Sequence, residues 1–91
     1  MSLERVRVEI DDIDRQIVTL IAQRTEWVRR VVDCKSSTSD IIVPEREAEV
    51  LANVRKFAAE LGADVDVVEK IYRALLAAFV EFEFRHIMAE R

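Results

Sequence analysis

The chain has 91 residues, of which 51% are apolar and 35% are charged, and its formal net charge is −4. A chain of this length forms one domain, and a single Gly and a single Pro supply too few turns for a sheet, so we expect an all-α fold. The negative charge argues against nucleic acid as a partner, because phosphate binding needs clustered Lys and Arg, and the single Cys excludes an internal disulfide and a Cys-rich metal site.

The spacing of apolar residues predicts one long and two shorter helices in a single domain over residues 1–91. The first helix covers about residues 3–35, with Ser2 as its N-cap, and the polar segment KSSTSD ends it by competing for backbone hydrogen bonds. The second covers about 44–61, from Pro44, whose fixed φ suits a first helical turn, to the stop signal Gly62. The third covers about 64–90 and is apolar around most of its circumference.

The first helix carries an apolar stripe with alternating steps of three and four residues, formed by Leu3, Val6, Ile10, Ile13, Ile17 and Leu20. A helix of about 32 residues extends roughly 48 Å, whereas the second helix extends only about 27 Å, so the chain cannot cover the whole stripe itself. A sustained repeat of this kind favours pairing between helices. We therefore expect a homodimer whose long helices pack on each other; the alternative is an elongated monomer with an exposed stripe.

The N-terminal segment MSLERVRVEIDD has no apolar signal region. No stretch of the sequence approaches the ~20 apolar residues of a membrane span. We therefore expect a cytoplasmic protein without a membrane partner.

Arg24 interrupts the apolar stripe of the first helix, which resumes at Trp27. A buried arginine needs a carboxylate or a bound anion, so either a salt bridge to another helix or a ligand would explain it. Lys35 lies eleven positions later, about 20° from the same azimuth, so both side chains could converge on a small anion. Arg7 lies seventeen positions before Arg24, roughly 25 Å away, and would reach the same ligand only from an antiparallel partner helix. A solvated surface arginine is the alternative for Arg7.

The two shorter helices also carry charges on apolar faces. Glu47 is in phase with the inward stripe of the second helix and Arg46 adjoins it, although charges near a helix N-terminus can also serve its dipole. Glu83 lies on the apolar stripe of the third helix, where a salt bridge to one of the arginines is the alternative to a ligand contact. We interpret His86 as a structural histidine, because no second metal-type ligand has a useful spacing, and Trp27 and the Phe residues as core.

The ordered set of these charges, together with the segments IDDIDRQIVTLIAQR and PEREAEVL, resembles the all-helical class of chorismate mutase over essentially the whole chain. The resemblance implies an intertwined all-α homodimer with two equivalent sites, each completed by an arginine of the partner chain. It implies that Arg7 is that arginine and holds one substrate carboxylate, that Arg24 binds the other, and that Lys35 contacts the ether oxygen and a carboxylate. It further implies that Arg46 supports the site, that Glu47 accepts from the ring hydroxyl, and that Glu83 takes the place of the second ether-oxygen donor.

The reaction that the resemblance implies is the unimolecular pericyclic rearrangement of chorismate, a dianion, to prephenate. It needs no nucleophile, metal or cofactor. Confinement of the substrate in a reactive conformer and donors placed at the ether oxygen, where negative charge grows, lower its barrier. Cationic side chains in a pocket are the groups expected for this chemistry. The partner of Arg24 would then be the substrate.

Three residues depart from the pattern of many bacterial mutases. Glu83 stands where they carry glutamine, and it must be protonated to donate, so we expect an activity that falls as pH rises. Val43 stands near an acidic position and Phe79 at a position that is often serine, which removes polar contacts to the substrate.

Three alternatives stay open from the sequence. The short loop SSTSDIIV looks like that of the related isochorismate pyruvate lyase, although Glu47 matches the mutase and the lyase is apolar there. A relative that acts on 4-amino-4-deoxychorismate would suit a changed set of carboxylates around the ring. The third alternative is a non-catalytic helical dimerisation or regulatory module, in which the charges are interhelical salt bridges.

Overall fold

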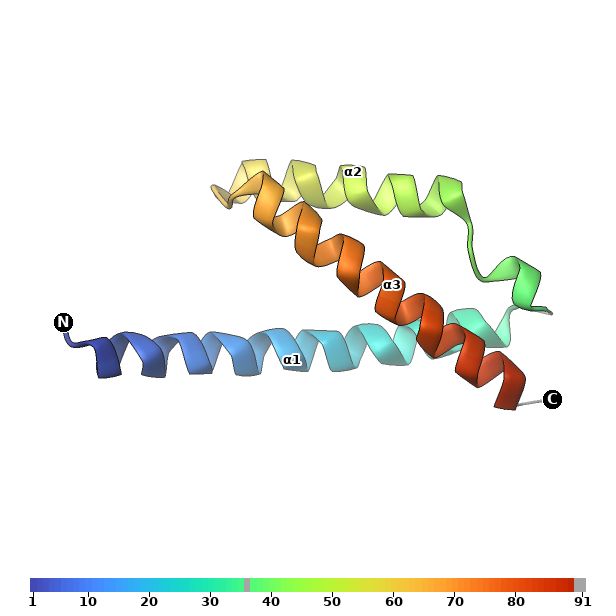
Figure 1. Cartoon of the computed structure of the whole chain (residues 1–91), viewed down its shortest axis with the longest axis horizontal. Coiled ribbons are helices and arrows are strands. Elements are labelled where there is room, and N and C mark those ends of the chain that lie inside the picture. The colour runs from blue at the N-terminus through green and yellow to red at the C-terminus, as the bar shows by residue number, and fades with distance from the viewer. Residues whose placement is uncertain (36, 90–91) are drawn as a thin grey trace.

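Three α-helices and one 3₁₀ turn make up the computed structural model, which describes residues 1–35 and 37–89. The elements are α1 (Leu3–Asp33), η1 (Thr38–Asp40), α2 (Pro44–Leu61) and α3 (Val65–Ala89). In Figure 1, α2 and α3 form a hairpin, and α3 runs diagonally back to cross the C-terminal half of α1, while the N-terminal end of α1 extends past the turn of the hairpin. The predicted all-α class with one long and two shorter helices is confirmed.

The limits of α1 follow from local hydrogen bonds. The Ser2 side chain accepts from the amide of Arg5 at 3.2 Å and caps the helix, as predicted. At the other end the amides of Cys34 and Lys35 donate to the carbonyls three residues before them, each at 3.0 Å. This 3₁₀-type tightening ends α1 at Asp33, two residues before the expected limit.

The hairpin of α2 and α3 is set by one proline, one glycine and one aspartate. Pro44 begins α2, and Gly62 ends it in the left-handed conformation with φ 72°, which lets the amide of Ala63 donate to a carbonyl of the last turn at 2.8 Å. The Asp64 carboxylate accepts from the amide of Val67 at 3.0 Å and caps α3. The described part of α3 ends at Ala89, so the expected limit at residue 90 lies outside the described residues.

The core of the chain is small and lies where α3 crosses the end of α1. Val32, Ile41 and Ile87 are at most 4% exposed and form a cluster against which Val80 and Phe84 pack. A second contact buries Val54 and Ala58 of α2 in the hairpin with α3.

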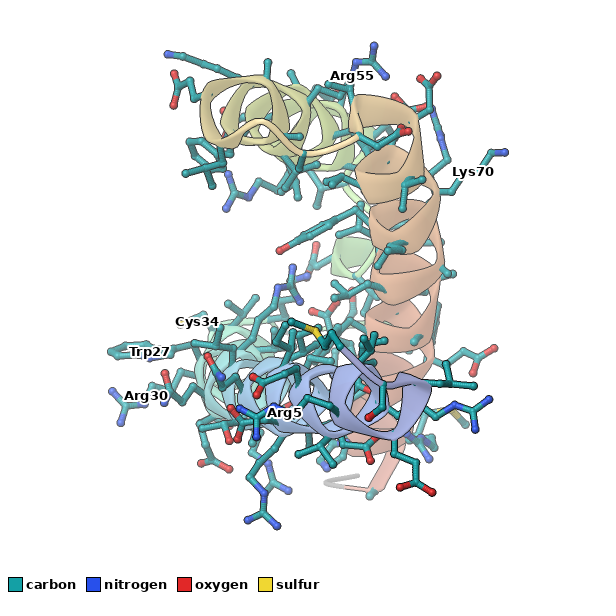
Figure 2. All side chains as sticks on the ribbon, turned by 90° about the vertical axis from the view of Figure 1, so that its left-hand side faces the viewer. Arg5, Trp27, Arg30, Cys34, Arg55 and Lys70 are labelled. Atoms are coloured by element: carbon teal, nitrogen blue, oxygen red, sulfur yellow. The ribbon has the colours of Figure 1, made fainter. Side chains whose placement is uncertain are left out.

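Much of the apolar surface of α1 is not covered by its own chain. The stripe residues Ile10, Ile13 and Ile17 are 51%, 53% and 48% exposed. The prediction of Trp27 and Phe57 as core is wrong for this chain, since both are more than half exposed. In Figure 2, Trp27 projects from the side of α1 that faces away from α3, so the helix that buries the end of α1 cannot cover it.

The lengths and hydropathies of the helices decide whether one of them could span a membrane. Over residues 1–35 and 37–89, no helix combines the length and the apolar character needed to cross a bilayer.

Candidate active site

A cavity of about 300 Å³ lies between the C-terminal half of α1, the first turns of α2 and the middle of α3. Its charged lining consists of Arg24, Lys35, Arg46, Glu47 and Glu83. The rest of the lining is apolar and aromatic and includes Val28, Val43, Leu76 and Phe79. Such a cavity, apolar with a few convergent polar groups, is typical of a binding site for a small molecule.

Three separate elements deliver the charged residues to this cavity. Arg24 lies on α1, Lys35 lies two residues after the end of α1 at Asp33, and Glu83 lies on α3. Arg46 and Glu47 occupy the first turn of α2, which begins at Pro44. Five of the six predicted site residues are thus brought together.

Arg7 is the predicted site residue that the chain does not bring to the cavity. It is exposed on the N-terminal half of α1 and is absent from the cavity lining. The continuous helix separates it from Arg24 by seventeen residues, or roughly 25 Å. An arginine side chain cannot span that distance within one chain.

The guanidinium of Arg24 is held without a carboxylate. Its Nη1 atom is buried and has no hydrogen-bond partner among the described residues. Its Cζ atom lies 4.5 Å from the centroid of the Phe79 ring. A buried cationic donor without an acceptor is unfavourable, so this group is suited to bind an anion that enters the cavity. The interhelical salt bridge considered for Arg24 does not form within the described part of the chain.

Lys35 and Glu83 form an ion pair across the cavity. The Nζ atom of Lys35 donates to Oε1 of Glu83 at 2.9 Å, and the two side chains are only 16% and 11% exposed. Nζ also donates to the carbonyl of Ile41 at 3.3 Å. The ammonium has three N–H donors, so the third is left for a ligand within the described part of the site. The salt bridge considered for Glu83 therefore forms, with lysine as its partner in place of an arginine.

Arg46 and Glu47 differ in how deeply they enter the site. Arg46 donates to Glu49 on the next turn of α2, and its side chain is 64% exposed, so it lies at the rim. Glu47 is half-buried in the cavity lining, where its carboxylate can accept a hydrogen bond from a ligand. The cavity thus combines three cations with two carboxylates, an arrangement suited to an anion that also carries a hydroxyl or amine.

Other reactive side chains lie away from this centre. Cys34 is exposed and does not line the cavity. The Nδ1 atom of His86 lies 2.8 Å from the carbonyl of Phe82, and its ring stacks on that of Phe82, which agrees with a structural histidine. Over the described ranges, no group of three His, Cys, Asp or Glu could hold a metal ion.

Phe79 and Ile41 are site residues that the sequence analysis did not identify. The sequence predicted only the loss of a polar contact at Phe79, yet its ring lies against the Arg24 guanidinium. Its position four residues before Glu83, on the same face of α3, was the available signal. Ile41 acts through its backbone carbonyl, for which a side-chain pattern carries no signal.

The sequence matches known proteins along most of its length. Residues 6–84 match the family of chorismate mutase type II. The chain is 40% identical over 76 residues to the T-protein of Enterobacter agglomerans, a match that covers 82% of the chain and 20% of the T-protein. It is 33% identical over 76 residues to the chorismate mutase of Methanocaldococcus jannaschii, covering 82% of the chain and 77% of that protein.

A relative of different activity also matches. The chain is 29% identical over 85 residues to the isochorismate pyruvate lyase of Pseudomonas aeruginosa, covering 93% of the chain and 84% of the lyase. The chain spans only about a fifth to a quarter of the T-protein and of the bifunctional chorismate mutase/prephenate dehydratase of Aquifex aeolicus. No solved structure matches it significantly. The match over residues 6–84, on a chain of three helices around a cationic cavity, shows that the chain belongs to the chorismate mutase type II family.

Proposed function

We propose that the chain catalyses the rearrangement of chorismate to prephenate. The observation that carries this proposal is the buried Nη1 atom of Arg24, which has no hydrogen-bond partner among the described residues, in a cavity that also contains Lys35, Arg46, Glu47 and Glu83. A cavity with a buried cation that no carboxylate of the described residues neutralises suits a dianionic substrate. The family match and the relative named chorismate mutase support the same reaction.

The proposed roles follow from the chemistry of a pericyclic reaction, in which a C–O bond breaks as a C–C bond forms. Arg24 binds one carboxylate, and Lys35 uses its free N–H at the ether oxygen and a carboxylate. Glu47 accepts from the ring hydroxyl, and Arg46 adds positive charge at the rim. These contacts hold the substrate in its reactive conformer and stabilise the charge that develops on the ether oxygen.

The charge of Glu83 affects the proposed reaction at the ether oxygen. In the ion pair with Lys35, an ionised Glu83 presents negative charge close to the place where the ether oxygen becomes negative. A protonated Glu83 instead offers an O–H donor to that oxygen and leaves Lys35 free to bind the substrate. A donor role at the ether oxygen therefore requires the neutral form of this side chain.

We further propose that the enzyme is an intertwined homodimer in which Arg7 completes the site of the partner subunit. The half-exposed stripe of Ile10, Ile13 and Ile17 gives α1 an apolar face that a second α1 would bury. Antiparallel pairing of the two long helices would carry Arg7 of one chain towards Arg24 of the other. The second substrate carboxylate would then be held in trans.

The test of the proposed function compares three substrates with one purified protein. Chorismate, isochorismate and 4-amino-4-deoxychorismate are incubated separately, and loss of each enol ether is followed by absorbance. We expect loss of chorismate with formation of prephenate, and a raised melting temperature with a bicyclic dianionic mimic of the transition state. Arg24→Ala should lower kcat/KM about 10- to 150-fold and weaken the stabilisation by the mimic, whereas Arg85→Ala, a substitution of an exposed residue outside the cavity, should change neither.

Each contrary result has a defined meaning. Intact chorismate together with no stabilisation by the mimic would refute the proposed function and favour a non-catalytic helical module. Turnover of the amino compound alone would assign the cavity to 4-amino-4-deoxychorismate.

Isochorismate pyruvate lyase activity is the second candidate, because the relative with that name matches 93% of the chain. The acidic Glu47 in the cavity lining favours the mutase, because the family resemblance implies an apolar residue here in the lyase. Release of pyruvate from isochorismate, with chorismate left intact, would reverse this ranking.

A further inference from the structure

Phe79 is the aromatic residue against which the Arg24 guanidinium lies. The distance from Arg24 Cζ to the ring centroid is 4.5 Å, and both side chains are half-buried in the cavity lining. A guanidinium at this distance over a ring is attracted by the negative potential of the ring face. Partial burial strengthens that attraction because fewer water molecules compete for the cation.

A ring face holds a guanidinium in a different way from a carboxylate. A carboxylate partner would use two N–H groups of the planar fork, which would then be lost to a ligand. Contact with a ring face engages no carboxylate, so the N–H groups of the fork stay available to a ligand. The absence of a hydrogen-bond partner for Arg24 Nη1 within the described residues agrees with this arrangement.

The Phe79 ring is itself supported along one side of α3. Phe82 meets it edge-to-face, with centroids 6.0 Å apart and an interplanar angle of 67°. Phe82 in turn stacks on His86 with centroids 4.0 Å apart, and Nδ1 of His86 lies 2.8 Å from the Phe82 carbonyl. This row of rings restricts the orientation of Phe79 and, through it, that of Arg24.

We propose that Phe79 is a positioning residue, which holds Arg24 in its anion-binding orientation through the ring face while leaving its donors free. The proposal rests on the proposed function, because it assumes that Arg24 binds a carboxylate of the substrate. That carboxylate is present in both the ground state and the transition state, so loss of positioning acts mainly on KM. We expect KM and the Kd of the bicyclic dianion to rise about tenfold when the ring contact is lost, with kcat nearly unchanged.

The sharpest test changes the electrostatics of the ring without changing its size appreciably. Phe79 is replaced by 4-fluoro-, 3,5-difluoro- and pentafluorophenylalanine, which weaken the negative potential of the ring face step by step. We expect KM and Kd to rise in that order and Phe79→Leu to resemble the pentafluoro variant. Phe79→Trp, which keeps a strong ring face, should retain tighter binding than Phe79→Leu. The matched control is the same fluorinated series at Phe84, which packs against the apolar cluster of Val32, Ile41 and Ile87.

The outcomes separate this proposal from the proposed function. If the wild-type protein turns over chorismate but KM and Kd are equal along the Phe79 series, the ring is only a packing group and the positioning role is overturned. A fall in kcat at constant KM would also contradict it. If the wild-type protein neither turns over chorismate nor binds the dianion, both proposals fail, and the failure is visible before any variant is made. The fluorinated variants keep the shape of Phe79, so the test stands even if Phe79→Leu does not fold.

Discussion

The variants Arg7→Ala and Arg24→Ala, each of low activity alone, should regain activity when one chain of each forms a mixed dimer. In α1 the seventeen residues between Arg7 and Arg24 correspond to roughly 25 Å, so each proposed site needs Arg24 from one chain and Arg7 from the other. Loss of a charge-assisted contact to a carboxylate costs about 1.5–3 kcal/mol, so Arg7→Ala and Arg24→Ala should each lower kcat/KM about 10- to 150-fold. In a random mixture, half of the dimers are mixed and each of these has one intact site, which predicts about a quarter of wild-type activity.

The assay is co-refolding of the two variants from denaturant at equal concentrations, followed by chorismate turnover. Arg24→Ala mixed with Lys35→Ala is the control, because both residues belong to the same chain's cavity and no mixed dimer has an intact site. This control should stay as inactive as its components. If the Arg7→Ala and Arg24→Ala mixture were no more active than the separate variants, the assignment of Arg7 to the partner's site would be wrong. Wild-type protein taken through the same refolding gives the reference activity.

Three further predictions concern activity, stability and pH. Glu83→Gln should raise kcat/KM, because a neutral amide can donate an N–H to the ether oxygen whereas the carboxylate paired with Lys35 only accepts; an unchanged or lower kcat/KM would contradict the role of Glu83. Gly62→Ala should lower the free energy of unfolding by about 1 kcal/mol with unchanged kcat, because φ is 72° and no atom lies within 4 Å of the added Cβ; an unchanged urea midpoint would show that the turn is not strained. The hydrogen bond from Arg55 holds the pKa of the Glu69 carboxyl below its ordinary value of 4.5, so the small stabilisation is present above that pH and is lost as pH falls through the lower folded value. Arg55→Ala should therefore reduce the loss of stability on acidification in thermal unfolding, and an acid-side slope equal to that of the wild-type protein would speak against this pair.

The helices were predictable because the chain has very few residues that can end one. Ser2, Pro44 and Gly62 act locally, through a side-chain cap, a fixed φ and a left-handed φ, so their effects do not depend on the rest of the fold. The end of α1 was less predictable. Cys34 and Lys35 continue the chain with i−3 hydrogen bonds, and side-chain patterns do not distinguish that geometry from another helical turn.

The gathering of charges was predictable in part. The helical periodicity of the sequence predicted that Arg24 and Lys35 point in the same direction, and both residues line the cavity. The same periodicity does not predict which side chains of another helix will contact these two residues. The ion pair of Lys35 with Glu83 and the ring contact of Arg24 with Phe79 depend on the crossing of α3 over α1, which no local pattern specifies. The exposure of Trp27 has the same origin, since its helix face is apolar but lacks a covering helix in the chain.

The exposed Trp27 also gives the protein an intrinsic optical reporter. It is the chain's single tryptophan, it lines the cavity, and its ring carries the Arg30 guanidinium 4.3 Å from the centroid. Indole emission shifts to shorter wavelength when water around the ring is replaced by protein or ligand. Cavity filling and the proposed subunit association can therefore both be followed by fluorescence in the unlabelled wild-type chain, and titration of ligand at a fixed protein concentration separates one from the other.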